Sequence, residues 1–426
     1  MPGGPGRYAR VRGSGAGTRA TVPVVTDREA AFRMLRLLHT ADVHLGARHA
    51  DLGDAASAQR ERQFAAFSAS VDLALAEKTD LFLVAGDLFD SNVQPRRSVE
   101  RAAAEIGRLA QARIRTVLIP GTHDVYDRAS VYRAYDLAAM AGARPGDDMV
   151  TVLTPEQRWA YLPALDAVVH GPVFSTKRAP HSPMADIAKA LPLAPQVTWR
   201  IGLLHASVAI PGKTDGDEVV ITTDEIAASG LDYLALGHWH AAQVAKAKGV
   251  TYAYAGAPEP VAVDQDRAGK VLLVTLEERD GGRVIEVLER TVGRTTFQRM
   301  DVDAATLESQ PALITRLRAV AGKDLVLDLR LIGVRPDGLD VEPAEVEDAL
   351  RGEFLRVRVR DVSLPPLTAG SLPPAETIAG AFLRNVEGRI TELEATSDDA
   401  AEREAGELRD VLRLGRLLLA GEEVTL

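Results

Sequence analysis

The sequence predicts an α/β domain, followed by a smaller α+β unit and two C-terminal helices. From Met34 to about residue 275, short apolar segments alternate with amphipathic ones, which is typical of strands connected by helices. From about 296 to 364 the pattern is mixed, and a Pro-rich stretch then precedes two long amphipathic segments. A chain of 426 residues is too long for one ordinary core, which agrees with this division.

The elements of the large domain follow from hydrophobic spacing. Helical spacing of Ala, Leu, Phe and Val predicts helices over 57–78 and 97–112, and Thr222 with Glu225 forms a capping-box pattern. The apolar segments predict strands over 35–39, 81–85, 115–119, 166–170, 200–204, 232–236 and 251–255, and a hairpin over 270–277 and 284–290.

The rest of the chain is divided by the same criteria. The expected elements are helix 304–321, strand 325–331, helix 343–352, strand 354–361 and tail helices 375–395 and 399–420. The first 33 residues are rich in Gly, Pro and Arg without periodicity, so we expect a disordered extension or an over-long start before Met34. The predicted units are 1–33, 34–290, 291–365 and 366–426.

Composition excludes several classes of protein. The chain has no Cys, which excludes disulfides, thiolate metal sites and a cysteine nucleophile. No run of about 18 apolar residues is present, so we expect no membrane span. The formal charge of −10 argues against a protein that binds nucleic acid unaided, because such proteins are usually basic.

Five groups of polar residues stand directly after predicted strands. Strand ends in an α/β sheet can meet at one crevice, so these groups are expected to converge. The candidate site residues are Asp42 and His44, then Asp87, then Thr122, His123 and Asp124, then His205, and finally His238 and His240. Asp90, just after Asp87, is expected to cap the following helix or to support the centre.

Two carboxylates and several imidazoles at one crevice suit a pair of first-row divalent cations. Asp-x-His and His-x-His spacing in an extended loop would point both side chains the same way, because Cβ directions alternate with a period of two. Glycines at 86, 121 and 237 would let these loops approach a metal closely.

The whole pattern resembles the calcineurin-like metallophosphoesterases over about 34–260. Within that superfamily, the segments HTADVHLG, AGDLFD and LDYLALGHWH are similar to those of the SbcD-type DNA-repair exonuclease subunits of bacteria. The resemblance implies a four-layer αββα sandwich with a small α+β capping domain and C-terminal helices. It also implies a dinuclear metal centre, most often containing Mn²⁺.

Carried over residue by residue, the resemblance implies a role for each candidate. Asp42, His44 and His240 would hold one metal, and His205 and His238 the other, with Asp87 bridging both. His123 would stabilise or protonate the leaving oxygen, and Asp124 would orient its ring.

The chain departs from the family motif at one position. The family has Gly-Asn-His-Asp, in which the Asn carbonyl binds the second metal, and this chain has Thr122 in its place. A threonine hydroxyl is shorter and is a weaker ligand, so the second site is either weakened or is a fully active variant of the family.

The resemblance implies a two-metal phosphodiesterase that hydrolyses DNA as a repair exonuclease or endonuclease subunit. The expected partners are DNA, an SMC-like ATPase bound through the C-terminal helices, and a second copy of the chain, in the cytoplasm and without a membrane. One alternative is a phosphoesterase for a small substrate. Another is a weakly catalytic subunit that binds DNA ends or the ATPase, because of Thr122. Arg356, Arg358 and Arg360 form either a phosphate track or a solvated edge strand.

Overall fold

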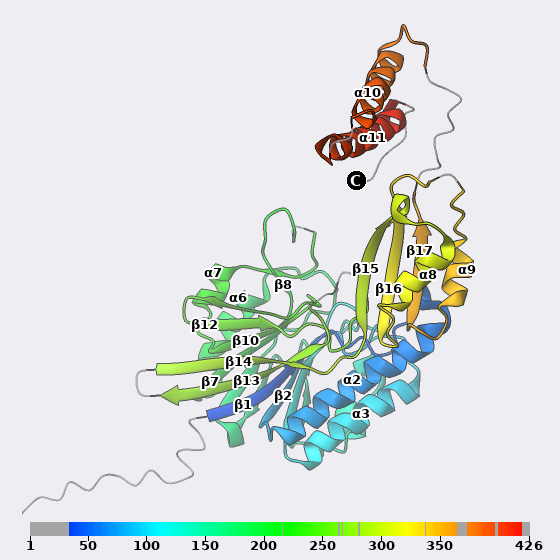
Figure 1. Cartoon of the computed structure of the whole chain (residues 1–426). Coiled ribbons are helices and arrows are strands. Elements are labelled where there is room, and N and C mark those ends of the chain that lie inside the picture. The colour runs from blue at the N-terminus through cyan, green and yellow to red at the C-terminus, as the bar shows by residue number, and fades with distance from the viewer. Residues whose placement is uncertain are drawn as a thin grey trace, which may run out of the picture.

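The computed structural model describes residues 34–214, 216–262, 265, 267–279, 282–336, 338–363, 373–396 and 399–419. Figure 1 shows the two large sheets of the first domain and the smaller sheet of the second unit. The predicted N-terminal extension and most of the Pro-rich linker lie outside the described residues. None of the described helices is long and apolar enough to cross a membrane.

The first large sheet has six strands in the order β14-β13-β1-β2-β3-β4. Its central strands β1 to β4 run parallel, and β13 and β14 add an antiparallel hairpin at one edge. The strand β2 is buried along its whole length, which explains its continuous apolar sequence LFLVA. The strands are β1 Met34–Thr40, β2 Leu81–Ala85, β3 Arg115–Ile119, β4 Val150–Val152, β13 Lys270–Arg279 and β14 Gly282–Thr291.

The second large sheet also has six strands, in the order β11-β12-β10-β7-β6-β5. Strands β6, β7, β10 and β12 are parallel, and both edge strands are antiparallel to their neighbours. The strands are β5 Trp159–Leu162, β6 Ala167–His170, β7 Trp199–His205, β10 Tyr233–Gly237, β11 Gln243–Ala247 and β12 Val250–Tyr254, and a separate pair is formed by β8 Ser207–Val208 and β9 Val220–Ile221.

The two large sheets pack face to face, with helices on the outer face of each. One apolar core lies between the sheets, a second lies under α2 and α3, and a third lies under α6 and α7. This is the αββα arrangement that the resemblance implied, and the predicted strands and long helices are confirmed within a few residues. The helices are α2 Ala56–Ala76, α3 Arg96–Gln111, α4 Val131–Ala134, α5 Leu137–Met140, α6 Pro183–Ala190 and α7 Thr223–Ala228, with 3₁₀ turns at Ala50–Ala55, Pro163–Leu165 and Leu191–Leu193.

The small unit is a three-stranded parallel sheet in the order β15-β16-β17. The prediction of one helix over 304–321 was wrong, because a 3₁₀ turn is followed by a new helix that Ser309 caps. A strand before that turn was also missed. The elements are β15 Thr296–Asp303, a 3₁₀ turn Ala304–Thr306, α8 Gln310–Arg318, β16 Leu325–Ile332, α9 Pro343–Ala349 and β17 Arg356–Asp361.

Arg62 of α2 joins the small unit to the large domain. Its guanidinium forms an ion pair with Asp324 at 2.6 Å and donates to the Lys323 carbonyl at 2.9 Å. The tail forms an antiparallel pair of helices, α10 Ile378–Glu394 and α11 Asp399–Leu419, close to their predicted bounds.

Candidate metal centre

The candidate residues lie at the carboxyl ends of five parallel strands drawn from both large sheets. Strands β1, β2 and β3 of the first sheet lead directly into the loops of Asp42, Asp87 and His123. Strand β7 of the second sheet ends at His205, and β10 leads into the loop of His238 and His240. The centre therefore forms only where the two sheets meet.

One group of ligand atoms comes from Asp42, His44 and His240, whose ligand atoms all lie within 4.8 Å of one another. Nε2 of His44 lies 3.2 Å from Nε2 of His240. The other nitrogen of His44, Nδ1, is 3.4 Å from the Asp90 carboxylate. Nδ1 of His240 lies 2.5 Å from the side-chain amide of Gln265. Each ring is thus held at Nδ1 while Nε2 faces the partner ring.

Asp87 stands between this group and His205. Its Oδ1 accepts the backbone N–H of His123 at 2.7 Å, which fixes the carboxylate. Its Oδ2 lies 3.2 Å from Nε2 of His205 and 3.9 Å from Nε2 of His44. One carboxylate oxygen therefore faces ligand atoms of both halves of the site.

His205 is buried, and Asp87 and Asp42 control its charge. Its Nδ1 bonds the Ala85 carbonyl at 2.9 Å, and its Nε2 has no hydrogen-bond partner although it is buried. Burial alone would lower the pKa of His205, but the carboxylates of Asp87 and Asp42 raise it to about 10. The same contacts hold the pKa of Asp87 well below its usual range, against the effect of burial.

These features match what a cation needs. Asp42 and Asp87 are almost completely buried, and among the described residues no Lys or Arg forms an ion pair with either. Buried carboxylates normally require a positive partner. Together with Nε2 of His205, which faces Oδ2 of Asp87 at 3.2 Å, they form a set of oxygen and imidazole donors that suits divalent first-row metals.

His238 and Thr122 lie on the His205 side of the centre. The ring of His238 packs edge-on against that of His205, with centroids 5.3 Å apart. Its Nε2 is 3.8 Å from Asp217, whose carboxylate accepts the Ser207 hydroxyl. Thr122 is buried and lines a pocket with His205. Among the described residues, His238 is absent from the three compact groups of ligand atoms.

His123 stands at the solvent edge, with 48% of its side chain exposed. Its ring packs edge-on against His44 with centroids 4.7 Å apart. Its Nδ1 bonds the Asp90 carbonyl at 3.0 Å, which leaves Nε2 without that restraint. An imidazole beside buried donors and open to solvent can exchange a proton with a ligand.

Asp124 does not orient the His123 ring, and that expectation needs correction. The carboxylate of Asp124 is fully buried and accepts hydrogen bonds from the Gly121 N–H at 2.7 Å, the Phe89 N–H at 3.1 Å and the Tyr132 hydroxyl at 2.5 Å. Burial and the neighbouring Asp87 raise the pKa of Asp124 to about 6. It connects the two loops that carry Asp87 and His123, and Asp90 holds the His123 ring.

Four of the candidate ligands have a backbone conformation that ordinary residues rarely adopt. The φ angles are 52° at Asp42, 50° at His44, 50° at Asp87 and 102° at His238. We expected an extended loop to point these side chains in the same direction. That explanation is wrong, because the residues adopt left-handed backbone conformations that set the side-chain directions. Such strain is concentrated at functional sites in proteins.

The glycines expected to allow close approach do so in two ways. Gly86 has a φ of +89°, and all three positions, Gly86, Gly121 and Gly237, lack space for a Cβ atom. A Cβ atom on Gly121 would collide with Asp87, and one on Gly237 would collide with the Ala85 carbonyl and lie 3.0 Å from Nδ1 of His205.

Several supporting residues were not foreseen. Gln265 lies 25 positions from His240 and Tyr132 lies eight positions from Asp124, and no motif marks either of them. Asp217 lies in the loop between β8 and β9 and was also missed. The expectation that Asp90 caps the next helix is wrong, because α3 begins only at Arg96 after Pro95.

Comparison with known proteins agrees with this geometry. Residues 35–242 match the family model described as calcineurin-like phosphoesterase. The matched segment is slightly less than half of the chain, it contains every candidate ligand, and it is similar to that family.

Two of the relatives are named as a DNA repair protein and as a nuclease subunit. The chain is 28% identical to the DNA double-strand break repair protein Mre11 of Aeropyrum pernix, over 63% of this chain and 64% of that protein. It is 29% identical to a subunit of the nuclease SbcCD of Rhodobacter capsulatus, over 54% of this chain and 64% of that protein. The match thus spans less than two thirds of either relative. A solved dimetal phosphatase from Danio rerio is 12% identical, with coverage of 61% and 99% and a TM-score of 0.36.

Proposed function

We propose that the chain is a two-metal phosphodiesterase that cuts DNA as the nuclease subunit of a repair complex. The observation that carries the proposal is the convergence of buried carboxylates and imidazoles without a Lys or Arg partner among the described residues. The DNA substrate is supported by relatives named as a double-strand break repair protein and a nuclease subunit.

The proposed ligand sets follow the two halves of the centre. Asp42, His44 and His240 would hold one cation, and His205, His238 and Thr122 the other, with Asp87 shared. Two divalent cations, with Mn²⁺ as the expected ion, would neutralise the phosphate and lower the pKa of a water.

The protein's own groups would then handle substrate and protons. His123 lies on the open side with its Nδ1 fixed by the Asp90 carbonyl, so Nε2 can give a proton to the leaving oxygen. Asp124 acts as a positioning residue, because its three hydrogen bonds hold the loops of Asp87 and His123 in register.

The test combines metal analysis with cleavage of linear duplex DNA in Mn²⁺. We expect the native chain to bind metal and cut, Asp87→Asn to lose both properties, and His123→Ala to keep the metal but lose at least about 100-fold in rate. His181→Ala serves as the matched control, because that exposed imidazole pairs with Asp186 and takes no part in the centre. Absence of both bound metal and His123-dependent cleavage would overturn the enzymatic proposal.

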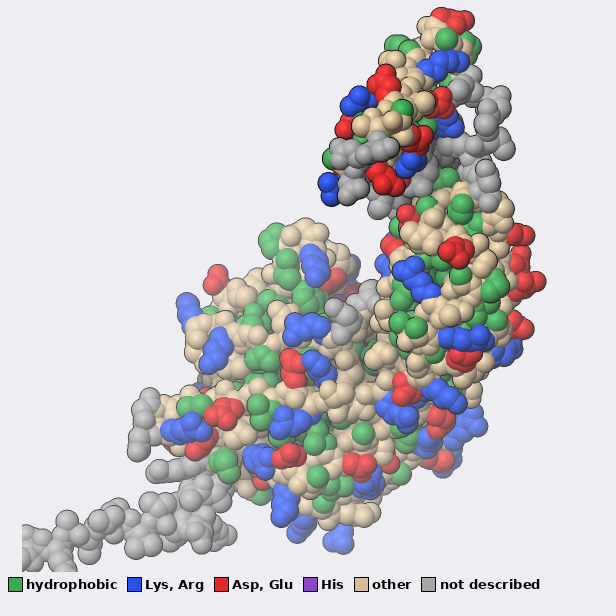
Figure 2. Space-filling model, in the orientation of Figure 1, with side chains coloured by type: hydrophobic (Ala, Val, Ile, Leu, Met, Phe, Trp, Pro, Cys, Tyr) green, Lys and Arg blue, Asp and Glu red, His purple; other side chains and the backbone are tan. Residues whose placement is uncertain are grey.

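A small-substrate phosphoesterase is the alternative, and a direct comparison separates the two. If DNA is the substrate, kcat/KM for linear DNA will exceed that for bis(p-nitrophenyl) phosphate by several orders of magnitude. Figure 2 shows acidic and basic side chains intermixed on the visible face, so we expect the metal centre and a partner to contribute much of the DNA affinity.

The C-terminal helices are the proposed contact for an SMC-like ATPase in the cytoplasm. They leave apolar side chains in solvent, with Ile378 92% exposed and Leu418 64% exposed. A name that calls one relative a subunit of a nuclease supports such an assembly. Ile378→Glu should abolish ATPase binding and leave metal content unchanged, whereas Glu402→Gln on the same pair should bind normally. A homodimer is a further proposal, which sedimentation of the native chain tests.

A further inference from the structure

His238 differs from the other candidate histidine ligands in the ring nitrogen that has a polar neighbour. His44, His205 and His240 each have an oxygen or an amide at Nδ1, at 3.4, 2.9 and 2.5 Å respectively. In His238 the polar neighbour lies at the opposite nitrogen, because the carboxylate of Asp217 is 3.8 Å from Nε2. The protein therefore presents this ring to the centre in a different way from the other three.

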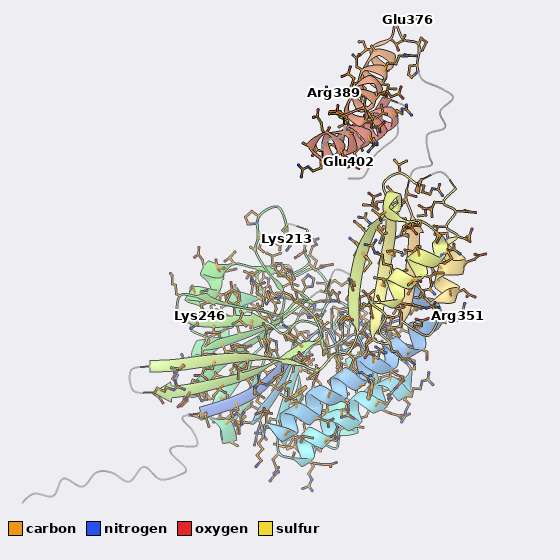
Figure 3. All side chains as sticks on the ribbon, viewed as in Figure 1. Lys213, Lys246, Arg351, Glu376, Arg389 and Glu402 are labelled. Atoms are coloured by element: carbon orange, nitrogen blue, oxygen red, sulfur yellow. The ribbon has the colours of Figure 1, made fainter. Side chains whose placement is uncertain are left out.

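Asp217 comes from the loop between β8 and β9, which extends from the large domain where Figure 3 labels Lys213. The backbone N–H of Asp217 donates to the Thr214 carbonyl at 3.1 Å, and the Thr214 hydroxyl accepts the Ile210 N–H at 2.9 Å. Thr214 is buried, so these bonds order the loop from within. Local structure thus sets the position of Asp217 before a metal binds.

A directed chain of hydrogen bonds ends at Asp217. The indole Nε1–H of Trp239 can only donate, and it donates to the Ser207 hydroxyl at 3.1 Å. The Ser207 hydroxyl in turn donates to Oδ2 of Asp217. A carboxylate can only accept, so a hydrogen bond between Asp217 and His238 requires that Nε2 of the imidazole carries the hydrogen.

Trp239, the first member of this chain, directly follows His238 and is held firmly. Its ring stacks on that of Tyr254, with centroids 5.3 Å apart and planes 14° apart. The Tyr254 hydroxyl accepts the Val208 N–H at 2.7 Å and donates to the Ala206 carbonyl at 3.0 Å. The hydrogen bonds that lead to Asp217 therefore start from a fixed ring.

We propose that Asp217 is a positioning residue that accepts the Nε2–H of His238 and thereby leaves Nδ1 of that ring to bind the second metal. This inference rests on the proposed two-metal centre and deepens it. The separation of 3.8 Å is longer than a hydrogen bond, so the contact shortens when the ring binds the metal. Such a carboxylate fixes the tautomer of a ligating histidine and raises the basicity of the ring.

The test identifies the metal-bound nitrogen of His238 in the chain loaded with Zn²⁺, a d¹⁰ ion that suits NMR. Long-range ¹H–¹⁵N spectra of the histidine-labelled chain distinguish a ring nitrogen that binds a metal from one that carries hydrogen. The signals that disappear in His238→Gln assign this ring. We expect metal at Nδ1 and hydrogen at Nε2 in His238, and the reverse in His44 and His240.

Substitution of Asp217 should weaken the second site. Asp217→Ala should lower its affinity for Mn²⁺ by about tenfold or more, the scale on which partners of ligating histidines act. The NMR signals of His238 should also become a mixture of both ring nitrogens, which a less stable loop alone would not cause while metal stays bound. Asp217→Asn should retain most of the affinity, because an amide oxygen can accept the same N–H.

Glu218→Ala is the matched control for these changes. Glu218 is the next residue of the same loop, and within the described part of the chain its carboxylate forms no hydrogen bond or ion pair. Titration calorimetry with Mn²⁺ measures the affinities, and the melting temperature of each variant verifies that it is folded. Glu218→Ala should bind Mn²⁺ as the native chain does.

The outcomes separate this inference from the proposed function. Zn²⁺ bound through Nε2 of His238, or equal Mn²⁺ affinity in Asp217→Ala and Glu218→Ala, overturns the role of Asp217 even if the chain cuts DNA. Ligation through Nδ1 that depends on Asp217 supports the role even if no DNA is cut, and the nuclease proposal then fails alone. A chain that takes up neither Zn²⁺ nor Mn²⁺ overturns both.

Discussion

At the scale of single residues, Thr122 is the position where this chain differs from the pattern that it resembles. Its short side chain is buried beside His205, in the half of the centre that also contains the more distant His238. A site that lacks one strong oxygen donor should bind its cation less tightly.

Thr122→Asn should therefore strengthen the second metal site. We expect Mn²⁺ affinity at that site to rise by about tenfold, the scale on which the groups around a metal act. Equilibrium dialysis against Mn²⁺ measures the change, and Thr176→Asn at the outer edge of the same pocket is the control. Unchanged affinity and unchanged phosphodiester hydrolysis would show that Thr122 is a fully active variation.

Gly237 is a second residue with a sharp consequence. A Cβ atom there would collide with the Ala85 carbonyl and crowd His205, so Gly237→Ala should cost about 1–3 kcal/mol of stability and displace His205. Gly249→Ala is the matched control, because a Cβ atom at that position meets nothing within 4 Å. Chemical denaturation and metal content measure both effects, and similar behaviour of the two variants would contradict the argument.

At the scale of elements, strand β6 ends in a buried histidine that makes the fold sensitive to acid. Neither ring nitrogen of His170 has a hydrogen-bond partner. Burial, with a smaller contribution from Arg200, lowers the pKa of His170 to about 4. As the pH falls, the imidazole of His170 therefore binds a proton near pH 6.5 in the unfolded chain but only near pH 4 in the folded chain.

His170→Leu should flatten the acid limb of the stability curve. Between pH 6.5 and 4 the native chain loses up to about 1.4 kcal/mol per pH unit through this group, and the variant should lose less. Urea denaturation at several pH values measures the slope. His39, whose pKa burial lowers to about 3, contributes in both proteins. An unaltered slope in His170→Leu would exclude the effect.

In the small unit, the prediction from sequence failed at strand β15 and at the break before α8, whereas β16, α9 and β17 were predicted within a few residues. Strand β15 was missed because its outward side chains, such as Arg299 and Asp301, are charged. The apolar spacing after the end of β15, which includes Leu313 and Leu317, favoured the prediction of one long helix. The signal that divides the predicted helix is local, since Ser309 accepts the Ala312 N–H. Continuous apolar strands such as β2 were predictable because burial on both faces leaves little alternative.

The basic strand β17 illustrates a related limit. Arg360 forms a two-point ion pair with Asp328, with contacts of 2.5 and 3.1 Å, and Arg356 pairs with Glu347 at 3.1 Å. These partners come from other elements, so sequence alternation alone could not reveal them. The observed pairing favours the solvated edge strand over a phosphate track.

At the scale of the whole molecule, the candidate metal centre lies where the two large sheets meet. Sequence motifs were enough to name the candidate ligands, because each directly follows an apolar strand. They could not show the left-handed backbone at Asp42, His44, Asp87 and His238. They also could not show that the Asp90 carbonyl holds the His123 ring, whereas Asp124 connects the loops of Asp87 and His123. Those depend on contacts between loops that are far apart in the chain.

Removal of metal should therefore destabilise the whole large domain. With chelator present, Asp42 and Asp87 remain buried without a cation, and at a metal concentration of about 100 Kd we expect stabilisation of about 2.7 kcal/mol. Thermal unfolding with EDTA and then with excess Mn²⁺ measures the shift. Asp87→Asn should show no metal-dependent shift, while Asp72→Asn on the surface of α2 should behave as the native chain does. Equal melting temperatures with and without metal would contradict this prediction.

One contact across the sheets has a kinetic consequence. The carboxylate of Asp42, after β1, accepts the backbone N–H of His238, after β10, at 3.0 and 3.2 Å, although 196 positions separate them in the chain. Neither sheet alone can assemble the full donor set. Metal uptake during refolding should consequently lag behind the formation of secondary structure and coincide with docking of the two sheets. The signal of a metal-sensitive dye would then measure the rate of this last step of assembly.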